Sequence, residues 1–244
     1  MKAMICFLLS LSMFPWESNR ENRFEDIRYK IPGIFNYPAK DDKDGFLHGM
    51  AHRLKLGYSQ TLGHIGSSNN SIYIDMGARN PDSSVNKFKH SYPNGHSFYT
   101  FAFEADPKFS EMYRGMQNLT YIQKAVSNKD GSCFFSKQSS LNAHMAHAKT
   151  KRESMQVECV DLKNWLDQNV PHSALAVAKM DVEKTEFELV PYLLQYPDTF
   201  RRIDELYLEC HHTETWGHRP HKFAECLEMF EDIRKIGIVV HEWF

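Results

Sequence analysis

From residue 71 onward, short apolar runs alternate with segments of helical periodicity, and this alternation limits the fold more than any other feature. The apolar runs include SIYID (71–75), ALAVAKMD (174–181) and ELYLECHH (205–212). Several runs are continuously apolar, which is typical of strands buried on both faces of a parallel sheet. The pattern therefore predicts an α/β fold with a mostly parallel sheet and helices on both faces.

The other expected elements follow the same two patterns. Further strands are expected at 98–104, 121–127, 132–137, 155–160 and 238–244. Segments with apolar residues three and four positions apart are expected to be helical at 85–92, 105–117, 161–169, 185–196 and 220–237. In the last of these helices the shared apolar face consists of Phe223, Cys226, Leu227, Phe230 and Ile233. The order predicts one α/β domain over residues 71–244.

The first 70 residues have a different character. Lys2 precedes an apolar run at 3–14, which is shorter than the ~20 residues of a membrane-spanning helix but as long as the apolar part of a secretory signal. We expect residues 1–16 to be a cleaved signal peptide or a short signal-anchor that attaches the protein to a membrane of the secretory pathway, such as the Golgi membrane. The alternative is a cytoplasmic protein whose N-terminal segment packs on the domain. Residues 17–70 are polar and rich in turn formers, which predicts an irregular N-terminal cap.

Charge and cysteine content exclude several classes of protein. The 29 Lys and Arg against 31 Asp and Glu give a net charge of −2, which argues against a nucleic-acid-binding protein. The five cysteines form no CxxC motif, so the spacings of thioredoxins and zinc ribbons are absent. Cys133 and Cys159 are able to pair across strands in an oxidising compartment. No feature of the sequence sets an oligomeric state.

Open parallel sheets bind ligands beyond the carboxyl ends of their strands, so polar residues at strand ends are the candidates for function. Asp75 and Gly77 end the first strand, and Gly77 permits a tight turn. The Asn-Pro pair at 80–81 is typical of an N-cap and a first helical residue. Glu104 ends the second strand, where a carboxylate is the expected partner of ribose hydroxyls. The alternative is that Glu104 and Asp106 stabilise the N-terminus of the next helix.

Two later strand ends carry charged residues beside apolar sequence. Lys179 lies within an apolar strand, where an unpaired charge is costly, and strand geometry places Asp181 and Glu183 on its side. Glu209 follows the apolar run LYL and has His211 on its side. Buried groups with charged neighbours have shifted pKa values and are candidate bases. The alternative is a buried ion network without chemistry.

A resemblance to a known family rests on five segments in this order and spacing: YIDMGARNPDSS, FAFEADPKF, VSNKDGSCFF, KMDVEKTEFELV and LYLECHH. They resemble the FkbM family of S-adenosylmethionine-dependent methyltransferases, and within it a plant group of methyltransferase-like proteins. The resemblance covers residues 71–244, and KMDVEKTEFELV is its most specific element. It implies a Rossmann-like class I methyltransferase fold with seven strands, the last of them reversed. It also implies S-adenosylmethionine as cofactor and a hydroxyl of a small molecule or glycan as methyl acceptor.

The resemblance further implies roles for the residues at the strand ends. Those implied to bind the cofactor are Asp75, Gly77, Ala78, Glu104, Asp106, Ala125 and Val126. Those implied to face the transferred methyl group and the acceptor are Asp181, Glu183, Glu209 and His211. None of these residues is expected to hold a metal ion in this interpretation.

Three functional hypotheses follow. In the first, an O-methyltransferase, His211 or Asp181 removes the acceptor proton and Glu209 holds the imidazole in one tautomer. The second is a protein that binds the cofactor or a glycan without turnover. It is suggested by residues 79, 81 and 184, which are Arg, Pro and Lys where the family usually has Asn, Gly and Gly. The third is a divalent-metal enzyme that uses the same acidic residues with His211 and His212, although no HExxH spacing is present.

Overall fold

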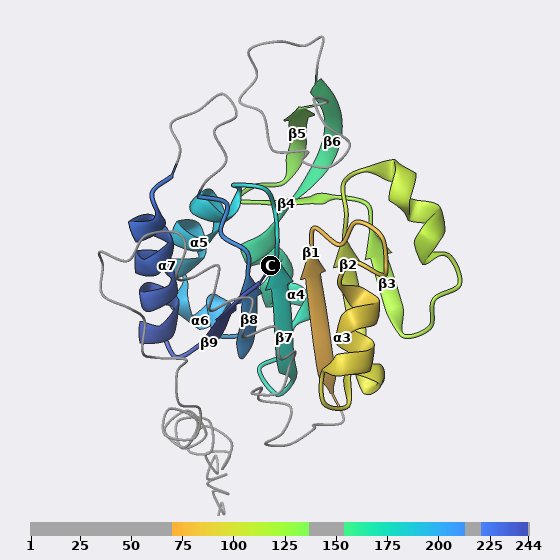
Figure 1. The fold of residues 1–244 in the computed structure, drawn as a ribbon, viewed down its shortest axis with the longest axis horizontal. Helices are drawn as coiled ribbons and strands as arrows, with labels where there is room; N and C mark the ends of the chain where they lie inside the picture. The colour runs from red at the N-terminus through yellow and green to blue at the C-terminus, as the bar shows by residue number, and fades with distance from the viewer. Residues whose placement is uncertain (1–69, 137–153, 213–220, 244) are drawn as a thin grey trace, which may run out of the picture. The chain divides into compact units, whose positions relative to one another are not determined.

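The computed structural model describes residues 70–136, 154–212 and 221–243 (Figure 1). The predictions made for residues 1–16 and for the cap up to residue 69 lie outside these ranges. No helix within the described ranges has both the length and the apolar character needed to cross a membrane.

A six-stranded sheet forms the centre of the domain, and its order is β3-β2-β1-β7-β8-β9. All neighbouring strands in it are parallel. The strands are β1 (Ser71–Met76), β2 (Tyr99–Phe103), β3 (Leu119–Ile122), β7 (Leu175–Met180), β8 (Glu205–Leu208) and β9 (Val239–Glu242). The predicted α/β fold with a parallel sheet is therefore confirmed, and the strand order is compatible with a Rossmann-like fold.

The expected reversal of the last strand is wrong, because β9 runs parallel to β8. Helix α7 (Phe223–Lys235) lies between the two strands in the sequence and carries the chain back to the starting edge of the sheet. A crossover of this kind produces a parallel neighbour, whereas a reversed strand needs a hairpin-like return. In the described ranges the central sheet has six strands, not the seven that the resemblance implied.

A second, three-stranded sheet consists of β4 (Ala125–Ser127), β5 (Gly131–Ser136) and β6 (Ser154–Asp161), with β6 in the middle. The antiparallel pair of β5 and β6 confirms the two additional strands predicted at 132–137 and 155–160. A disulfide joins Cys133 of β5 to Cys159 of β6, with their Cα atoms 5.8 Å apart. The cross-strand pairing considered from the sequence is thus present.

Helices cover both faces of the central sheet (Figure 1). Those that pack on one face are α4 (Leu162–Asn169), α5 (Glu186–Leu194), α6 (Pro197–Phe200) and α7. Their apolar side chains form the main core with every second residue of the strands, such as Ile74 and Ala178. On the other face Tyr73 stacks on Phe88 of α3 (Val85–Ser91), with ring centroids 3.7 Å apart.

Two expected helices differ from the prediction. The side-chain oxygen of Asn80 accepts hydrogen bonds from the backbone N–H groups of Asp82 and Ser83, as predicted for an N-cap, but residues 81–84 form a turn and α3 begins only at Val85. The segment expected to be helical at 105–117 forms the short 3₁₀ helix η3 (Pro107–Tyr113), which Asp106 caps. Another 3₁₀ turn, η2 (Gly95–Ser97), precedes β2. The turn at 80–83 follows the carboxyl end of β1, and η3 follows that of β2.

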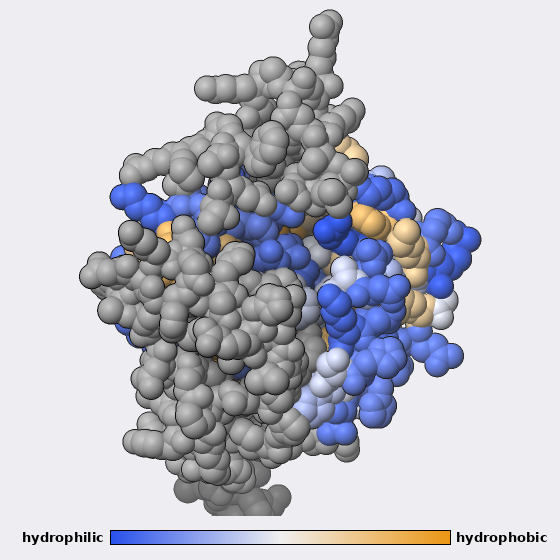
Figure 2. Space-filling view, in the orientation of Figure 1, coloured by the Kyte–Doolittle hydropathy of each residue, from blue (hydrophilic) through white to orange (hydrophobic). Residues whose placement is uncertain are grey.

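The described part of the surface in Figure 2 is mainly hydrophilic. Large hydrophobic side chains that are exposed within the described ranges are Tyr99, Met112 and Tyr196. Scattered exposed side chains of this kind are normal for a folded protein and do not mark a binding surface.

Candidate functional site

An open pocket lies at the carboxyl ends of β1, β2 and β7 and at the start of β4. It encloses about 730 Å³, including space open to solvent. Seven of the predicted site residues line it: Gly77, Glu104, Asp106, Ala125, Val126, Asp181 and Glu183. Phe103, Phe109 and Met155 add apolar surface. Its mixture of apolar surface with a few carboxylates is typical of a small-molecule site.

Asp75 and Ala78 do not line this pocket, because both are completely buried. The Asp75 carboxylate accepts a short hydrogen bond from the hydroxyl of Ser84. The carbonyl of Ala78 accepts hydrogen bonds from the hydroxyls of Ser83 and Tyr113, each at 2.9 Å. The two residues thus stabilise the turn after β1, and neither lines the pocket in this structure.

Gly77 brings two parts of the backbone together. It has a φ of 81°, and a Cβ atom added to it would lie 1.9 Å from the carbonyl oxygen of Asp181. The N–H groups of Gly77 and Ala78 both donate to the carbonyl of Phe103. The sequence predicted that Gly77 permits a tight turn, and the structure shows that it also lets the β1 turn approach the segment after β7.

Glu104 is held at the pocket wall by backbone donors. Its Oε2 accepts from the N–H of Arg79 at 2.9 Å, and its Oε1 accepts from the N–H of Asp106 at 2.7 Å. Burial raises the pKa of Glu104, and the two N–H donors lower it in part. Because a carboxylate oxygen can accept two hydrogen bonds, each oxygen retains acceptor capacity towards the pocket.

Two of the three residues that differ from those usual in the FkbM family, which this chain resembles, coincide with unusual backbone geometry. Arg79 and Lys184 have φ values of 47° and 75°, and Glu183 also has a φ of 47°. This left-handed region costs about 1 kcal/mol or more for most side chains and little for Gly or Asn. Asn and Gly are the residues usual in the family at positions 79 and 184. The substitutions therefore place larger side chains on backbone that favours the smaller ones.

Replacement of Lys184 by Gly is expected to raise the free energy of unfolding by up to about 1 kcal/mol, because glycine adopts a positive φ without the steric cost. The check is urea denaturation of the wild type and the variant. Lys184→Ala is the matched control, since it removes the same side chain but keeps the steric cost of a positive φ. Equal stabilities of the Gly and Ala variants would contradict the prediction.

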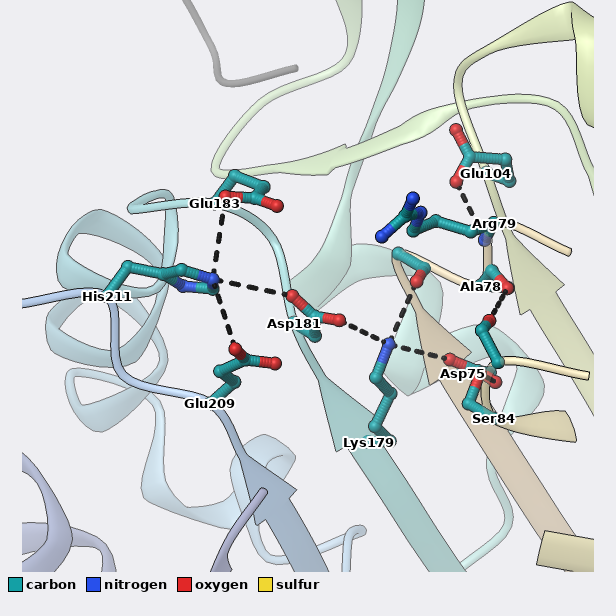
Figure 3. Close-up of polar contacts among 12 residues, drawn as sticks. Asp75, Ala78, Arg79, Ser84, Glu104, Lys179, Asp181, Glu183, Glu209 and His211 are labelled. Atoms are coloured by element: carbon teal, nitrogen blue, oxygen red, sulfur yellow. Dashed lines mark hydrogen bonds and ion pairs between the residues drawn. The ribbon is translucent and has the colours of Figure 1, made fainter. Parts of the chain in front are cut away.

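Lys179 lies in the interior of the site, and its side chain is 2% exposed. Its Nζ lies 3.0 Å from Asp181 Oδ2 and 3.5 Å from Asp75 Oδ1, and it donates to the carbonyl of Gly77 at 2.9 Å (Figure 3). Burial lowers the pKa of Lys179, but the two carboxylates outweigh this effect and raise the pKa above its usual value. The predicted pairing of Lys179 with Asp181 is confirmed. The second partner, Asp75, was not predicted, although it is the register neighbour of Lys179 across β1 and β7.

Glu186 fixes the position of His211 and was not predicted. Its Oε1 accepts from the backbone N–H of His211 and lies 2.9 Å from the ring Nδ1. Glu186 lies at the start of α5 and is completely buried. We expected Glu209 to hold the imidazole in one tautomer. This expectation is wrong for the Nδ1 atom, because the partner of Nδ1 is Glu186.

Three carboxylates surround the other ring nitrogen (Figure 3). The Nε2 of His211 lies 3.6 Å from Asp181 Oδ1 and 3.5 Å from both Glu183 Oε2 and Glu209 Oε1. We call Asp181, Glu183, Glu209 and His211 the acid–histidine cluster. The four residues predicted to face the methyl acceptor are thus brought together, and two of them also line the pocket.

The charges of the cluster alter its protonation. Burial lowers the pKa of His211, but the hydrogen bond to Glu186 and the neighbouring carboxylates outweigh it and raise the pKa to about 10. Burial raises the pKa of Glu209 to about 7, with the charge of Asp181 adding to the effect. An imidazole that is already protonated has no lone pair with which to take a proton. A pKa of about 10 leaves His211 mostly protonated at neutral pH, so these surroundings do not favour it as the base.

His212 belongs to a different group. A disulfide joins Cys210, at the end of β8, to Cys226 of α7, with their Cα atoms 6.1 Å apart. The His212 Nδ1 lies 3.2 Å from the carbonyl oxygen of Cys210. A ring nitrogen of His212 and the sulfur atoms of Cys210 and Cys226 lie within 4.8 Å of one another. The two cysteines of this group are joined in a disulfide and are not thiolates, which are the form of cysteine that binds metals, so the metal hypothesis fits the group with His211 and not the group with His212.

Comparison with known proteins adds one family. Residues 134–244 match a family described as a domain of unknown function (DUF7870). No curated protein matches the chain, and no solved structure does. The matched part contains the whole acid–histidine cluster and excludes Gly77 and Glu104.

Proposed function

We propose that the protein is a class I methyltransferase that transfers a methyl group from S-adenosylmethionine to a hydroxyl. The observation that carries the proposal is the pocket, where the turn after β1, Glu104 after β2 and the carboxylates after β7 share one wall. Ligand binding at this edge is general for open parallel sheets. The parallel direction of β9 departs from the implied fold, but no residue of β9 lines the pocket.

The pocket residues fit the parts of this cofactor. Glu104 has the acceptor capacity that a ribose diol needs. Ala125, Val126 and Phe103 provide apolar surface for the adenine ring. Asp181 and Glu183 provide negative charge on the side where a cationic sulfur would be favoured. When bound, S-adenosylmethionine supplies a methyl group that an acceptor oxygen takes from a positively charged sulfur, with release of the hydroxyl proton.

The chain itself has to hold the acceptor, exclude water and receive that proton. Asp181 and Glu183 are placed for this task, because they line the pocket and also belong to the acid–histidine cluster. Lys179 holds Asp181 through its other oxygen. The acceptor hydroxyl is therefore assigned to the space between the pocket and the cluster.

The two disulfides support a location in the secretory pathway, because such bonds persist in oxidising compartments. They agree with the signal or signal-anchor expected at residues 1–16. A hydroxyl of a sugar or glycan is a natural acceptor there, so we propose glycan O-methylation as the first reaction to test.

A second candidate is a protein that binds the cofactor without methyl transfer. Arg79 lines the pocket and adds a cation where the resembling family usually has Asn. Binding of S-adenosylhomocysteine together with no methyl transfer to any tested sugar acceptor would favour this candidate.

Replacement of Glu104 by Gln tests the cofactor site. We expect the variant to bind S-adenosylmethionine about 10–100-fold more weakly, because hydrogen bonds to a charged group contribute about 1.5–3 kcal/mol. The measurement is a calorimetric titration of the full chain, with thermal unfolding to confirm that the variant is folded. Glu111→Gln, at an exposed position of η3, is the matched control and should bind as the wild type does. An unchanged affinity in Glu104→Gln would exclude this pocket as the ribose site.

A further inference from the structure

Glu186 holds the imidazole of His211 in one orientation. The side chain of His211 is 8% exposed, and Glu186 accepts from both its backbone N–H and its Nδ1. This pairing places a proton on Nδ1 and directs Nε2 at the three carboxylates of the cluster. A carboxylate behind a histidine in this way is the usual arrangement around a metal-binding imidazole.

Three carboxylates face the Nε2 of His211. The oxygens of Asp181, Glu183 and Glu209 lie 3.5–3.6 Å away, and no hydrogen bond to Nε2 is formed within the described ranges. A neutral imidazole would direct its lone pair at three anions, which is repulsive. A cation between these four groups removes the repulsion.

The spacing fits a metal ion better than a proton. A proton on Nε2 can bond well to one oxygen at a time, and at about 2.7–2.9 Å when the acceptor is a carboxylate. A cation with ligands at about 2.0–2.2 Å separates neighbouring ligand atoms by roughly 3.0–3.5 Å. The candidate ligand atoms of Asp181, Glu183 and His211 all lie within 4.8 Å of one another. The side chains of Asp181, Glu183 and Glu209 are 18%, 18% and 31% exposed, which leaves an open side for further ligands.

We propose that Asp181, Glu183, Glu209 and His211 form a binding site for one divalent cation, with Mn²⁺ as the preferred ion. Three carboxylate oxygens favour hard cations such as Mg²⁺ and Mn²⁺, and the single imidazole favours Mn²⁺ between these two.

This inference deepens the proposed function and rests on it for the role of the ion. Asp181 and Glu183 belong to both the cluster and the pocket, so the open side of the cation site faces the assigned acceptor position. A hydroxyl bound to a divalent cation loses its proton more easily, and the cation also fixes its orientation. The substrate class is therefore a hydroxyl compound that chelates a cation, such as a sugar with neighbouring hydroxyls.

Mn²⁺ binding to the full chain tests the site. The protein is stripped with a chelator, and MnCl₂ is titrated while free Mn²⁺ is followed by electron paramagnetic resonance. We expect one saturable site per chain. His211→Ala and Glu183→Gln should each weaken Mn²⁺ binding at least about 10-fold. Glu186→Gln should weaken Mn²⁺ binding about 10–100-fold, because Glu186 acts on the ion through the imidazole.

Matched controls separate this result from general effects. His90→Ala and Glu111→Gln, on α3 and η3, should leave the affinity unchanged. Thermal unfolding checks each variant, and Glu183→Gln carries the test if His211→Ala fails to fold. Absence of saturable Mn²⁺ binding, or equal affinities in the wild type and Glu183→Gln, would overturn the proposal. S-adenosylmethionine is titrated separately into the metal-free protein, so that loss of the cofactor site and loss of the cation site give different results.

Discussion

Replacement of Lys179 by Met is expected to lower the free energy of unfolding by about 3–5 kcal/mol, as is typical when one partner of a buried ion pair is removed. Lys179 is the cation between Asp75, which is completely buried, and Asp181. Methionine has a similar shape but leaves the carboxylate of Asp75 without its neutralising charge. The measurement is urea denaturation of the wild type and the variant.

Two further variants locate the cause of this loss. Lys235→Met removes an exposed lysine that pairs with Asp232, and it should change stability by less than about 0.5 kcal/mol. The double variant Lys179→Met with Asp75→Asn should recover part of the loss, because no charge is then buried at Asp75. A Lys179→Met variant as stable as the wild type would show that the pair does not stabilise the fold.

Replacement of Gly77 by Ala is expected to lower the free energy of unfolding by about 2–5 kcal/mol. The positive φ accounts for about 1–2 kcal/mol. The remainder comes from the contact of 1.9 Å with the carbonyl oxygen of Asp181, since backbone must shift to relieve it. The shift moves Asp181, so Mn²⁺ and S-adenosylmethionine should both bind more weakly.

Gly115 provides the matched control. It has a φ of 78°, close to that of Gly77, but a Cβ atom there would meet nothing within 4 Å. Gly115→Ala should therefore lose only the conformational part, about 1–2 kcal/mol, and should keep both binding activities. Equal losses of unfolding free energy in the two variants would mean that the close approach of the β1 turn to the end of β7 does not add to the cost of a Cβ atom at Gly77.

The strands show how far the sequence predicts this fold. Continuous apolar runs predicted β1, β7 and β8 because a strand buried on both faces has few other compositions. The run at 121–127 was expected to be one strand, but the chain turns where Lys124 donates to the carbonyl of Ile122, and it divides into β3 and β4. The wrong direction of β9 came from the resemblance and not from the residues.

In the site too, some contacts were predicted from the sequence and others were not. Lys179 with Asp181, and Glu209 with His211, were predicted because residues two apart in a strand share a side. Glu186 was missed, since its contact with His211 joins the start of α5 to the end of β8 across 25 positions. No local spacing shows such a contact. Its only sign in the sequence was an acidic residue in a helical first turn, which also occurs for reasons of helix stability.

The amino-acid order alone determined that this chain forms a parallel α/β sheet with carboxylates and a histidine at its strand ends, because periodicity and burial act over neighbouring residues. The tertiary structure decided which of these groups face one another. It placed Asp75 in the interior with Lys179, Glu104 at the pocket, and three carboxylates around one nitrogen of His211. These distances depend on how separate strands and helices pack, and packing over long separations in the sequence leaves no local pattern to read.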